Sequence, residues 1–128
     1  ELLKTKIETH RSTVYLVNTG WIGGSAASGA KRISIQNTRA MITSILNGTI
    51  EQAEFKMEPV FGLSCPQSLP EVNSELLNPR TSWSSTEDYD KQAITLGELF
   101  TNNFKTYGKA VSYLEHAGPV KNHKEIAI

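Results

Sequence analysis

The spacing of hydrophobic positions predicts short helices and strands in the first third of the chain. Apolar residues recur at helical spacing over residues 1–9, which predicts a short amphipathic helix. Residues 14–17 form an uninterrupted Val-Tyr-Leu-Val run, and such a run predicts a strand covered on both faces. Polar and apolar positions alternate over residues 31–35, which predicts a second short strand.

The next pattern predicts a second helix and a less regular region. Asn37 or Thr38 is suited to be the N-cap of an amphipathic helix, and Asn47-Gly48 is suited to end it. Residues 53–64 alternate well enough to predict one edge strand, with Pro59 at an edge or a bend. Residues 65–79 are rich in proline and polar side chains, which predicts an irregular surface connection.

The most regular amphipathic pattern lies near the C-terminal end. Ser84 or Ser85 begins a capping-box signal, and apolar positions then step by three and four over residues 86–107. We expect the aromatic members of this stripe to pack in a core, Gly108 to end the helix, and residues 111–116 to add a short helix. The pattern as a whole indicates an α/β fold, as one compact unit or part of one.

Composition narrows the function classes. The chain has 128 residues, 38% of them hydrophobic, which is typical of a globular domain. Basic and acidic residues number 13 each, so the zero net charge gives no general argument for a nucleic-acid or membrane partner. No apolar run has the length of a membrane span and no signal peptide is recognised, while the single Cys65 favours a reducing compartment. The first residue is not methionine, so we expect a piece of a longer protein.

A glycine-rich loop is the one strong candidate site. Residues 20–32 read GWIGGSAASGAKR, which has the span of a Walker A loop but not its order, since Ala30 precedes Lys31 and Arg32 stands where a hydroxyl is needed. One interpretation is an ordinary connection between strands. The other is a ligand-binding loop in which Lys31 or Arg32 contacts an anionic or planar group, with the helix start near Thr38 offering backbone N–H groups and a hydroxyl.

Other reactive side chains carry weaker signals. His10, His116 and His123 lie far apart in the sequence, so we expect solvated histidines and no metal site. Cys65 lies beside a proline in a loop, and a buried or unreactive thiol is the favoured interpretation. Asn47-Gly48-Thr49 matches a glycosylation sequon, but a helix C-cap explains it better.

Several of these motifs together resemble a known family. Residues 14–24 read VYLVNTGWIGG, residues 29–35 read GAKRISI, and residues 38–40 read TRA. In this order they resemble the C-terminal region of ATP-dependent phosphoenolpyruvate carboxykinases, and the resemblance continues to about Gly118-Pro119. The family pattern places the lysine directly after the glycine, so the intervening Ala30 makes the loop one residue longer here.

The resemblance implies a fold and an activity. Residues 1–128 would be the C-terminal portion of the mixed-sheet, kinase-like ATP-binding domain of a cytoplasmic enzyme of gluconeogenesis. Such enzymes convert oxaloacetate and ATP to phosphoenolpyruvate, ADP and CO2 with Mg²⁺ and Mn²⁺. Arg32, Ile33 and Thr38 would line the nucleotide pocket: Arg32 stacks on or bonds the adenosine, Ile33 supplies apolar contact and Thr38 supplies its hydroxyl.

The same resemblance implies what this segment lacks. The family's P-loop, metal ligands and oxaloacetate-binding arginine precede it, so we expect no catalytic or metal-binding residue here and no activity from the segment alone. Its expected partners are the upstream remainder of the same protein and, through the complete enzyme, ATP and oxaloacetate; a homo-oligomer stays open. The alternatives are a non-catalytic piece acting only in folding or subunit contact and, less favoured by the position of Lys31, an independent P-loop phosphatase or kinase.

Overall fold

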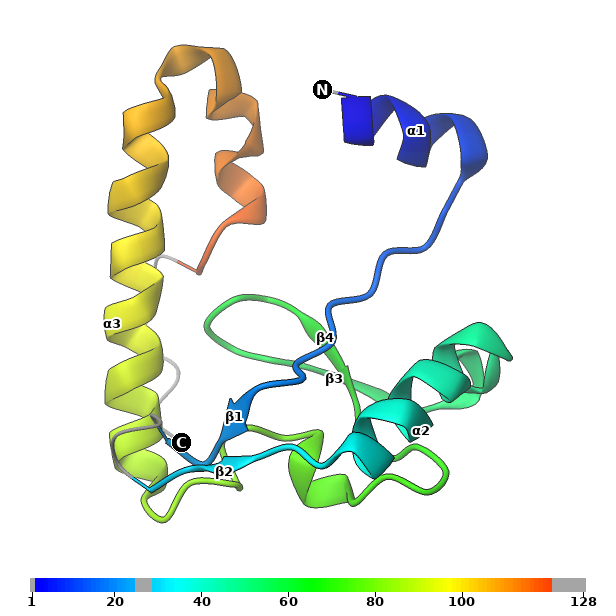
Figure 1. Cartoon of the computed structure of the whole chain (residues 1–128). Helices are drawn as coiled ribbons and strands as arrows, with labels where there is room; N and C mark the ends of the chain where they lie inside the picture. The colour runs from blue at the N-terminus through cyan, green and yellow to red at the C-terminus, as the bar shows by residue number, and fades with distance from the viewer. Residues whose placement is uncertain (1, 25–28, 121–128) are drawn as a thin grey trace.

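A computed structural model of the chain describes residues 2–24 and 29–120. Figure 1 shows α3 along one side of the molecule, with α2 and two small hairpins beside its first half and α1 set apart from them. Helices and small sheets are both present, as the α/β prediction requires. The elements, with η denoting a 3₁₀ helix, are α1 (Leu2–His10), β1 (Trp21–Ile22), β2 (Lys31–Arg32), α2 (Ile35–Leu46), η2 (Thr49–Gln52), β3 (Phe55–Met57), β4 (Ser64–Pro66), η3 (Ser74–Leu76), α3 (Thr86–Phe104), η4 (Lys105–Tyr107) and η5 (Lys109–Ala117).

Two antiparallel pairs of strands make up the sheet structure of the described residues. In the first pair Trp21 lies opposite Arg32 and Ile22 opposite Lys31. In the second pair β3 and β4 align with Lys56 opposite Cys65. Each sheet has two strands, so every strand keeps one edge without a neighbour in the described part of the chain.

The predicted strand at residues 14–17 is wrong. These residues are extended but have no assigned partner strand, and Val14 and Leu16 are exposed rather than covered. The strand predicted over residues 31–35 is confirmed only at Lys31–Arg32, because α2 already begins at Ile35. A β-rich sequence makes a strand only where a neighbour can satisfy its backbone.

The start of α2 also differs from its prediction, whereas its end is confirmed. Ser34, not Asn37 or Thr38, is the N-cap, because its Oγ accepts a hydrogen bond from the Asn37 N–H at 3.2 Å. Asn37 supports that cap by donating its side-chain amide to the same Oγ at 2.9 Å. Asn47 ends the helix, and Gly48 follows with a φ of 76°, a conformation that glycine adopts at little cost.

Residues 53–64 form a turn and parts of two strands rather than one edge strand. The chain reverses at Glu58, whose carboxylate accepts hydrogen bonds from the N–H groups of Val60 at 3.1 Å and Phe61 at 2.6 Å. The Glu58 N–H then donates to the Leu63 carbonyl at 2.8 Å, which closes the loop between β3 and β4. The irregular connection predicted for residues 65–79 is therefore confirmed only in part, since it contains the end of β4 and η3.

The long C-terminal helix agrees well with the sequence. Ser85 caps α3 by accepting from the Asp88 N–H at 3.1 Å, and η4 extends the helical path to Tyr107 before Gly108. The short helix predicted over residues 111–116 lies within η5. The expectation that the aromatic stripe packs in a core is only partly met: Phe100 meets Phe61 edge-on at 5.9 Å between centroids but stays 56% exposed.

The core is small for a chain of this length. Met41, Ile50 and Leu69 are its buried centre, and Tyr15 packs against them from the extended segment. The structure exposes 9877 Å², whereas a self-contained monomer of 14.1 kDa exposes about 6,700 Å² by the usual scaling. Many large apolar side chains of the described residues are exposed, among them Leu2, Leu16 and Leu46. No helix among them is long and apolar enough to cross a membrane.

We predict that truncation at the core centre destabilises the chain whereas truncation of a nearby exposed residue does not. Ile50 is 4% exposed, so Ile50→Ala should lower the free energy of unfolding by about 2–5 kcal/mol. Leu46 is 82% exposed, so the control Leu46→Ala should change it by less than about 0.5 kcal/mol. Urea unfolding of the 128-residue chain measures both, and equal losses would contradict this placement of the core.

Candidate functional site

The turn before the glycine-rich loop is fixed by one asparagine. The Asn18 Oδ1 accepts a hydrogen bond from the Gly20 N–H at 2.9 Å, and its Nδ2 donates to the Trp21 carbonyl at 3.2 Å. The Ile33 N–H donates to the Gly20 carbonyl at 2.9 Å, which continues the pairing of β1 with β2. Both stems of the loop are thus held together. The extra Ala30 belongs to a loop of which residues 25–28 lie outside the described residues.

In the glycine-rich loop, the backbone of Gly23 lies close to the backbone of Ser82. Gly23 has a φ of 82°, and a Cβ at this position would lie 2.8 Å from the Ser82 carbonyl oxygen. Any side chain here would therefore force the two segments apart. The turn that carries Ser82 is itself braced, because the Ser82 hydroxyl donates to the Pro79 carbonyl at 2.7 Å and the Arg80 N–H donates to Asn78 Oδ1 at 3.1 Å.

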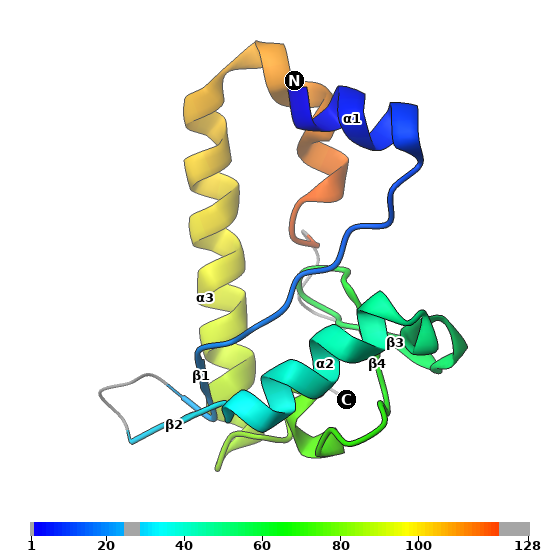
Figure 2. The ribbon, with the colours of Figure 1, turned by 45° about the vertical axis from the view of Figure 1, so that its right-hand side comes forward.

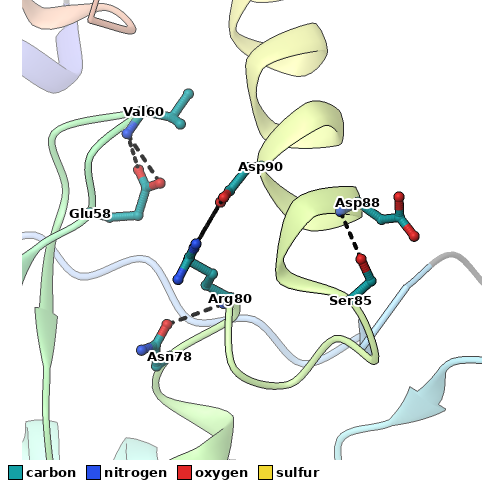
Figure 3. A network of polar contacts seen from close by, with 7 residues as sticks. All are labelled: Glu58, Val60, Asn78, Arg80, Ser85, Asp88 and Asp90. Atoms are coloured by element: carbon teal, nitrogen blue, oxygen red, sulfur yellow. Dashed lines mark hydrogen bonds and ion pairs between the residues drawn. The ribbon is translucent and has the colours of Figure 1, made fainter. Parts of the chain in front are cut away.

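An ion pair connects that turn to α3 (Figure 3). Arg80 donates from Nε to Asp90 Oδ1 at 2.8 Å and from Nη2 to Oδ2 at 2.9 Å. These hydrogen bonds hold the pKa of Asp90 below its ordinary value of 3.8. Trp83 packs edge-on against Tyr89 at 5.8 Å, and burial, with the Glu58 charge next, raises the pKa of Tyr89 to about 12. One ion pair and one aromatic pair therefore join residues 80–83 to α3.

An apolar cavity of about 460 Å³ lies beside the β1–β2 ribbon. Ile33 is 6% exposed and is one of its lining residues. The cavity is also lined by Tyr15, Val17, Ile22, Met41 and Trp83. A space of this size and lining is typical of small-molecule sites.

The predicted site residues occupy three different environments. Lys31 and Arg32 are exposed, and their side chains make no hydrogen bond or ion pair with another residue in the described ranges. Arg32 and Ile33 differ sharply in burial, as expected of neighbours on opposite faces of an extended chain. Arg32 is therefore open to solvent while Ile33 belongs to the cavity wall.

Thr38 lies within α2. The expectation that the helix starts near Thr38 and offers open N–H groups there is wrong. Its N–H donates to the Ser34 carbonyl at 3.0 Å, so this backbone group is used within the helix and cannot bind a ligand. The N–H groups left open at this end belong to Ile35 and Gln36, because the helix begins three residues earlier than predicted. The Thr38 hydroxyl is half-buried and makes no hydrogen bond to another described residue.

The histidines and Cys65 form no metal-binding or reactive site in the described part of the chain. The described residues contain no group of three or more His, Cys, Asp or Glu side chains that could hold a metal ion. His10 and His116 are exposed as predicted, and His123 lies outside the described residues. Burial, followed by the Glu58 charge, raises the pKa of the Cys65 thiol, which disfavours the reactive thiolate and agrees with an unreactive cysteine.

Sequence reasoning missed the residues that shape the loop. Asn18 carries a signal that could have been used, since asparagine two residues before a glycine commonly bonds its own backbone. Ser34 stands three residues before Asn37, which is the spacing of an N-cap. The contact between Gly23 and Ser82 joins positions far apart in the sequence and has no local signal.

A pair of glycine variants separates close contact from backbone strain. Gly23 and Gly29 have φ values of 82° and 81°, so alanine should cost about 1–2 kcal/mol of strain at either position. Only at Gly23 does the new Cβ meet a backbone atom, whereas Gly29 has nothing within 4 Å. We expect Gly23→Ala to lower the free energy of unfolding by at least about 1 kcal/mol more than Gly29→Ala. Denaturant unfolding tests this, and equal losses would contradict the contact.

Comparisons with known proteins agree with the motifs of the loop. A family model described as phosphoenolpyruvate carboxykinase matches residues 1–75. The chain is 43% identical over 119 residues to the phosphoenolpyruvate carboxykinase (ATP) of Caldanaerobacter subterraneus subsp. tengcongensis, covering 93% of this chain and 23% of the relative. It is 44% identical over 119 residues to phosphoenolpyruvate carboxykinase (ATP) 1 of Moorella thermoacetica, covering 93% and 22%. The Sulfurimonas denitrificans relative of the same name is 45% identical over 121 residues, covering 93% and 23%. The chain thus spans less than a quarter of the length of these relatives.

Proposed function

The chain belongs to the family of ATP-dependent phosphoenolpyruvate carboxykinases, and on that premise we propose that it supplies adenosine-side contacts to the nucleotide of such an enzyme. Residues 1–128 would form the C-terminal portion of the nucleotide-binding domain, and the rest of the enzyme would provide the P-loop and the metal ligands. The reaction would convert oxaloacetate and ATP to phosphoenolpyruvate, ADP and CO2, in the cytoplasm and in gluconeogenesis.

The observation that supports this proposal is Arg32, which is exposed on the β1–β2 ribbon and has no partner among the described residues. A guanidinium can form two parallel hydrogen bonds to oxygens or stack on a planar base, and Arg32 has no protein partner in the described part of the chain that would compete. Ile33 would contribute apolar contact where it lines the neighbouring cavity. The free Thr38 hydroxyl would bond a polar edge of the nucleoside.

The chemical step itself would take place outside these contacts. Breaking the carbon–carbon bond of oxaloacetate releases CO2 and leaves an enolate, whose oxygen attacks the γ-phosphorus while ADP leaves. Mg²⁺ and Mn²⁺ would stabilise the enolate and the transferring phosphoryl group by their charge. Since the described residues offer no metal-ligand cluster, this chain's contribution would be to position the nucleotide, and we expect the chain alone to be inactive.

A second candidate function is a non-catalytic role in folding or subunit contact. The large exposed area of the chain is the observation that favours it, because such an area is suited to cover another part of a protein. The two candidates are separated by a chimera in which this chain replaces the matching segment of the Moorella thermoacetica relative. The first candidate requires ATP-dependent decarboxylation of oxaloacetate by a folded chimera, and a folded but inactive chimera would support the second.

Within that chimera, Arg32→Ala should weaken nucleotide use selectively. A hydrogen bond to a charged group contributes about 1.5–3 kcal/mol, so we expect the KM for ATP to rise by about tenfold or more. The KM for oxaloacetate should change by less than about twofold, because Arg32 is assigned to the adenosine side. Steady-state kinetics with each substrate varied in turn measures both values.

The matched control is Arg11→Ala, which removes the same charge from an exposed position outside the ribbon. It should leave both KM values within about twofold, since exposed surface substitutions act weakly. Equal increases in the two KM values with Arg32→Ala, or an equal effect from Arg11→Ala, would count against the nucleotide-contact role.

A further inference from the structure

The turn at residues 78–82 lies between the β1–β2 ribbon and the start of α3. Figures 1 and 2 show the ribbon and the segment that precedes α3 side by side at that end of the helix. On the ribbon side, the Ser82 carbonyl oxygen lies so close to Gly23 that a Cβ there would be 2.8 Å away. On the helix side, Arg80 bonds Asp90 of α3. Two residues of one turn thus connect α3 to the ribbon.

The turn holds its own shape through short-range hydrogen bonds. The Thr81 N–H and the Thr81 hydroxyl both donate to the Asn78 carbonyl, at 3.2 and 3.0 Å. The Ser82 hydroxyl donates to the Pro79 carbonyl at 2.7 Å. Because the turn is tied in this way, a shift at Arg80 is passed on to Ser82.

The Arg80–Asp90 pair joins the turn to a capped and regular helix. α3 has 19 residues, and Ser85 caps it by accepting a hydrogen bond from the Asp88 N–H at 3.1 Å. Arg80 meets Asp90 through two hydrogen bonds of 2.8 and 2.9 Å, which fix the orientation of the guanidinium as well as its distance. A lysine does not reproduce this geometry, because its ammonium is a single point charge. The pair therefore determines where the turn lies relative to α3.

The pair contributes more to geometry than to overall stability. The side chains of Arg80 and Asp90 are 39% and 21% exposed. Ion pairs at such positions add little to the free energy of unfolding, because water screens the two charges. We therefore expect the chain to stay folded without the pair, while the turn is no longer held against α3.

Trp83 connects the end of the same turn to the apolar cavity. Its ring meets Tyr89 of α3 edge-on, with 5.8 Å between the ring centroids. Trp83 also lines the cavity to which Ile33 belongs. The contact at Gly23 and this part of the cavity wall therefore depend on one junction with α3.

We propose that Arg80 and Asp90 are positioning residues for the nucleotide contact of the β1–β2 ribbon, and that they act through the contact between Ser82 and Gly23. This inference rests on the proposed function, because Arg32 is the residue that they position. Arg80 itself is engaged by Asp90 and stays outside the nucleotide contact. A contact residue loses less binding energy to ordering when its backbone is already held in place. The pair therefore favours the binding of ATP and has no part in the binding of oxaloacetate.

Hydrogen exchange without nucleotide tests the connection from the pair to the ribbon. The Ile33 N–H donates to the Gly20 carbonyl at 2.9 Å, so its exchange reports opening of the ribbon. Arg80→Ala should speed this exchange by at least about threefold, both in the 128-residue chain and in the Moorella thermoacetica chimera. The Asn47 amide, which donates to the Thr43 carbonyl at 3.0 Å, should change by less than about twofold. Equal acceleration of the two amides, or no acceleration at Ile33, would overturn the proposal.

Steady-state kinetics of the chimera tests the link from the pair to the nucleotide. Arg80→Ala should raise the KM for ATP by at least about threefold and change the KM for oxaloacetate by less than about twofold. Arg80→Lys should restore only part of the loss, since it keeps the charge but not both hydrogen bonds.

The matched control for these kinetics is Lys91→Ala on the same helix. Lys91 forms an exposed ion pair with Asp88, with 4.0 Å between Nζ and Oδ1, and Lys91 lies next to Asp90 in the sequence. The control should leave both KM values within about twofold. Equal increases in the two KM values with Arg80→Ala, or an equal effect from Lys91→Ala, would overturn the proposal.

A double variant tests the route through Gly23. Gly23→Ala forces the ribbon away from Ser82, so the contact through which Arg80 acts is already disturbed. Adding Arg80→Ala to Gly23→Ala should therefore raise the KM for ATP by much less than Arg80→Ala does alone. Single effects that simply multiply in the double variant would show that Arg80 does not act through this contact, and would overturn the proposal.

The measurements separate this inference from the proposed function. If Arg32→Ala raises the KM for ATP while Arg80→Ala changes neither this KM nor the exchange of Ile33, the inference fails and the proposed function stands. If Arg80→Ala speeds the exchange of Ile33 but neither variant changes the KM for ATP, the proposed function fails and only the connection between α3 and the ribbon remains. If the chimera does not fold, the exchange of Ile33 in the 128-residue chain decides, and unchanged exchange there overturns the proposal.

Discussion

Burial of apolar surface is the constraint on which this arrangement depends. Met41, Ile50 and Leu69 bring α2, η2 and the loop after β4 together, and Tyr15 attaches the extended segment to the same cluster. The hydrophobic gain of such a cluster scales with its buried area, and here that area is small. Elsewhere the chain has local polar contacts, among them the two-fold hydrogen bonding of Arg80 with Asp90 between the Asn78–Ser82 turn and α3. The apolar faces left open are consistent with a chain that completes its core against another polypeptide.

Contacts with residues 80–82 hold the β1–β2 ribbon in place. The β1–β2 ribbon rests on Ser82 through Gly23, and the turn that carries Ser82 is bound to α3 through Arg80. A flexible arginine on a loosely held loop would lose much of its binding energy to ordering, whereas one on a braced ribbon loses less. In the proposed nucleotide contact, the backbone that carries Arg32 would therefore need little further ordering.

Local signals predicted the helices well and the strands poorly, for a physical reason. The N-cap at Ser85 and the C-cap at Asn47 depend on neighbours within a few residues, so the sequence displays them directly. A strand needs a partner from elsewhere in the chain, and for residues 14–17 no partner occurs in the described ranges. The glycine-rich pattern singled out the loop with Lys31 or Arg32, and the family resemblance predicted a nucleotide role for Arg32. The contact between Gly23 and Ser82 and the true start of α2 at Ile35 required the structure.

In the proposed function, the β1–β2 ribbon contacts the adenosine side of the nucleotide. The most direct test is photolabelling of the Moorella thermoacetica chimera with 8-azido-ATP, followed by peptide mapping. We expect saturable labelling, suppressed by excess ATP, on the peptides that contain Arg32 and Ile33–Arg39. Label that ATP suppresses but that maps only to the Moorella thermoacetica portion, or to parts of this chain remote from the ribbon, would contradict it.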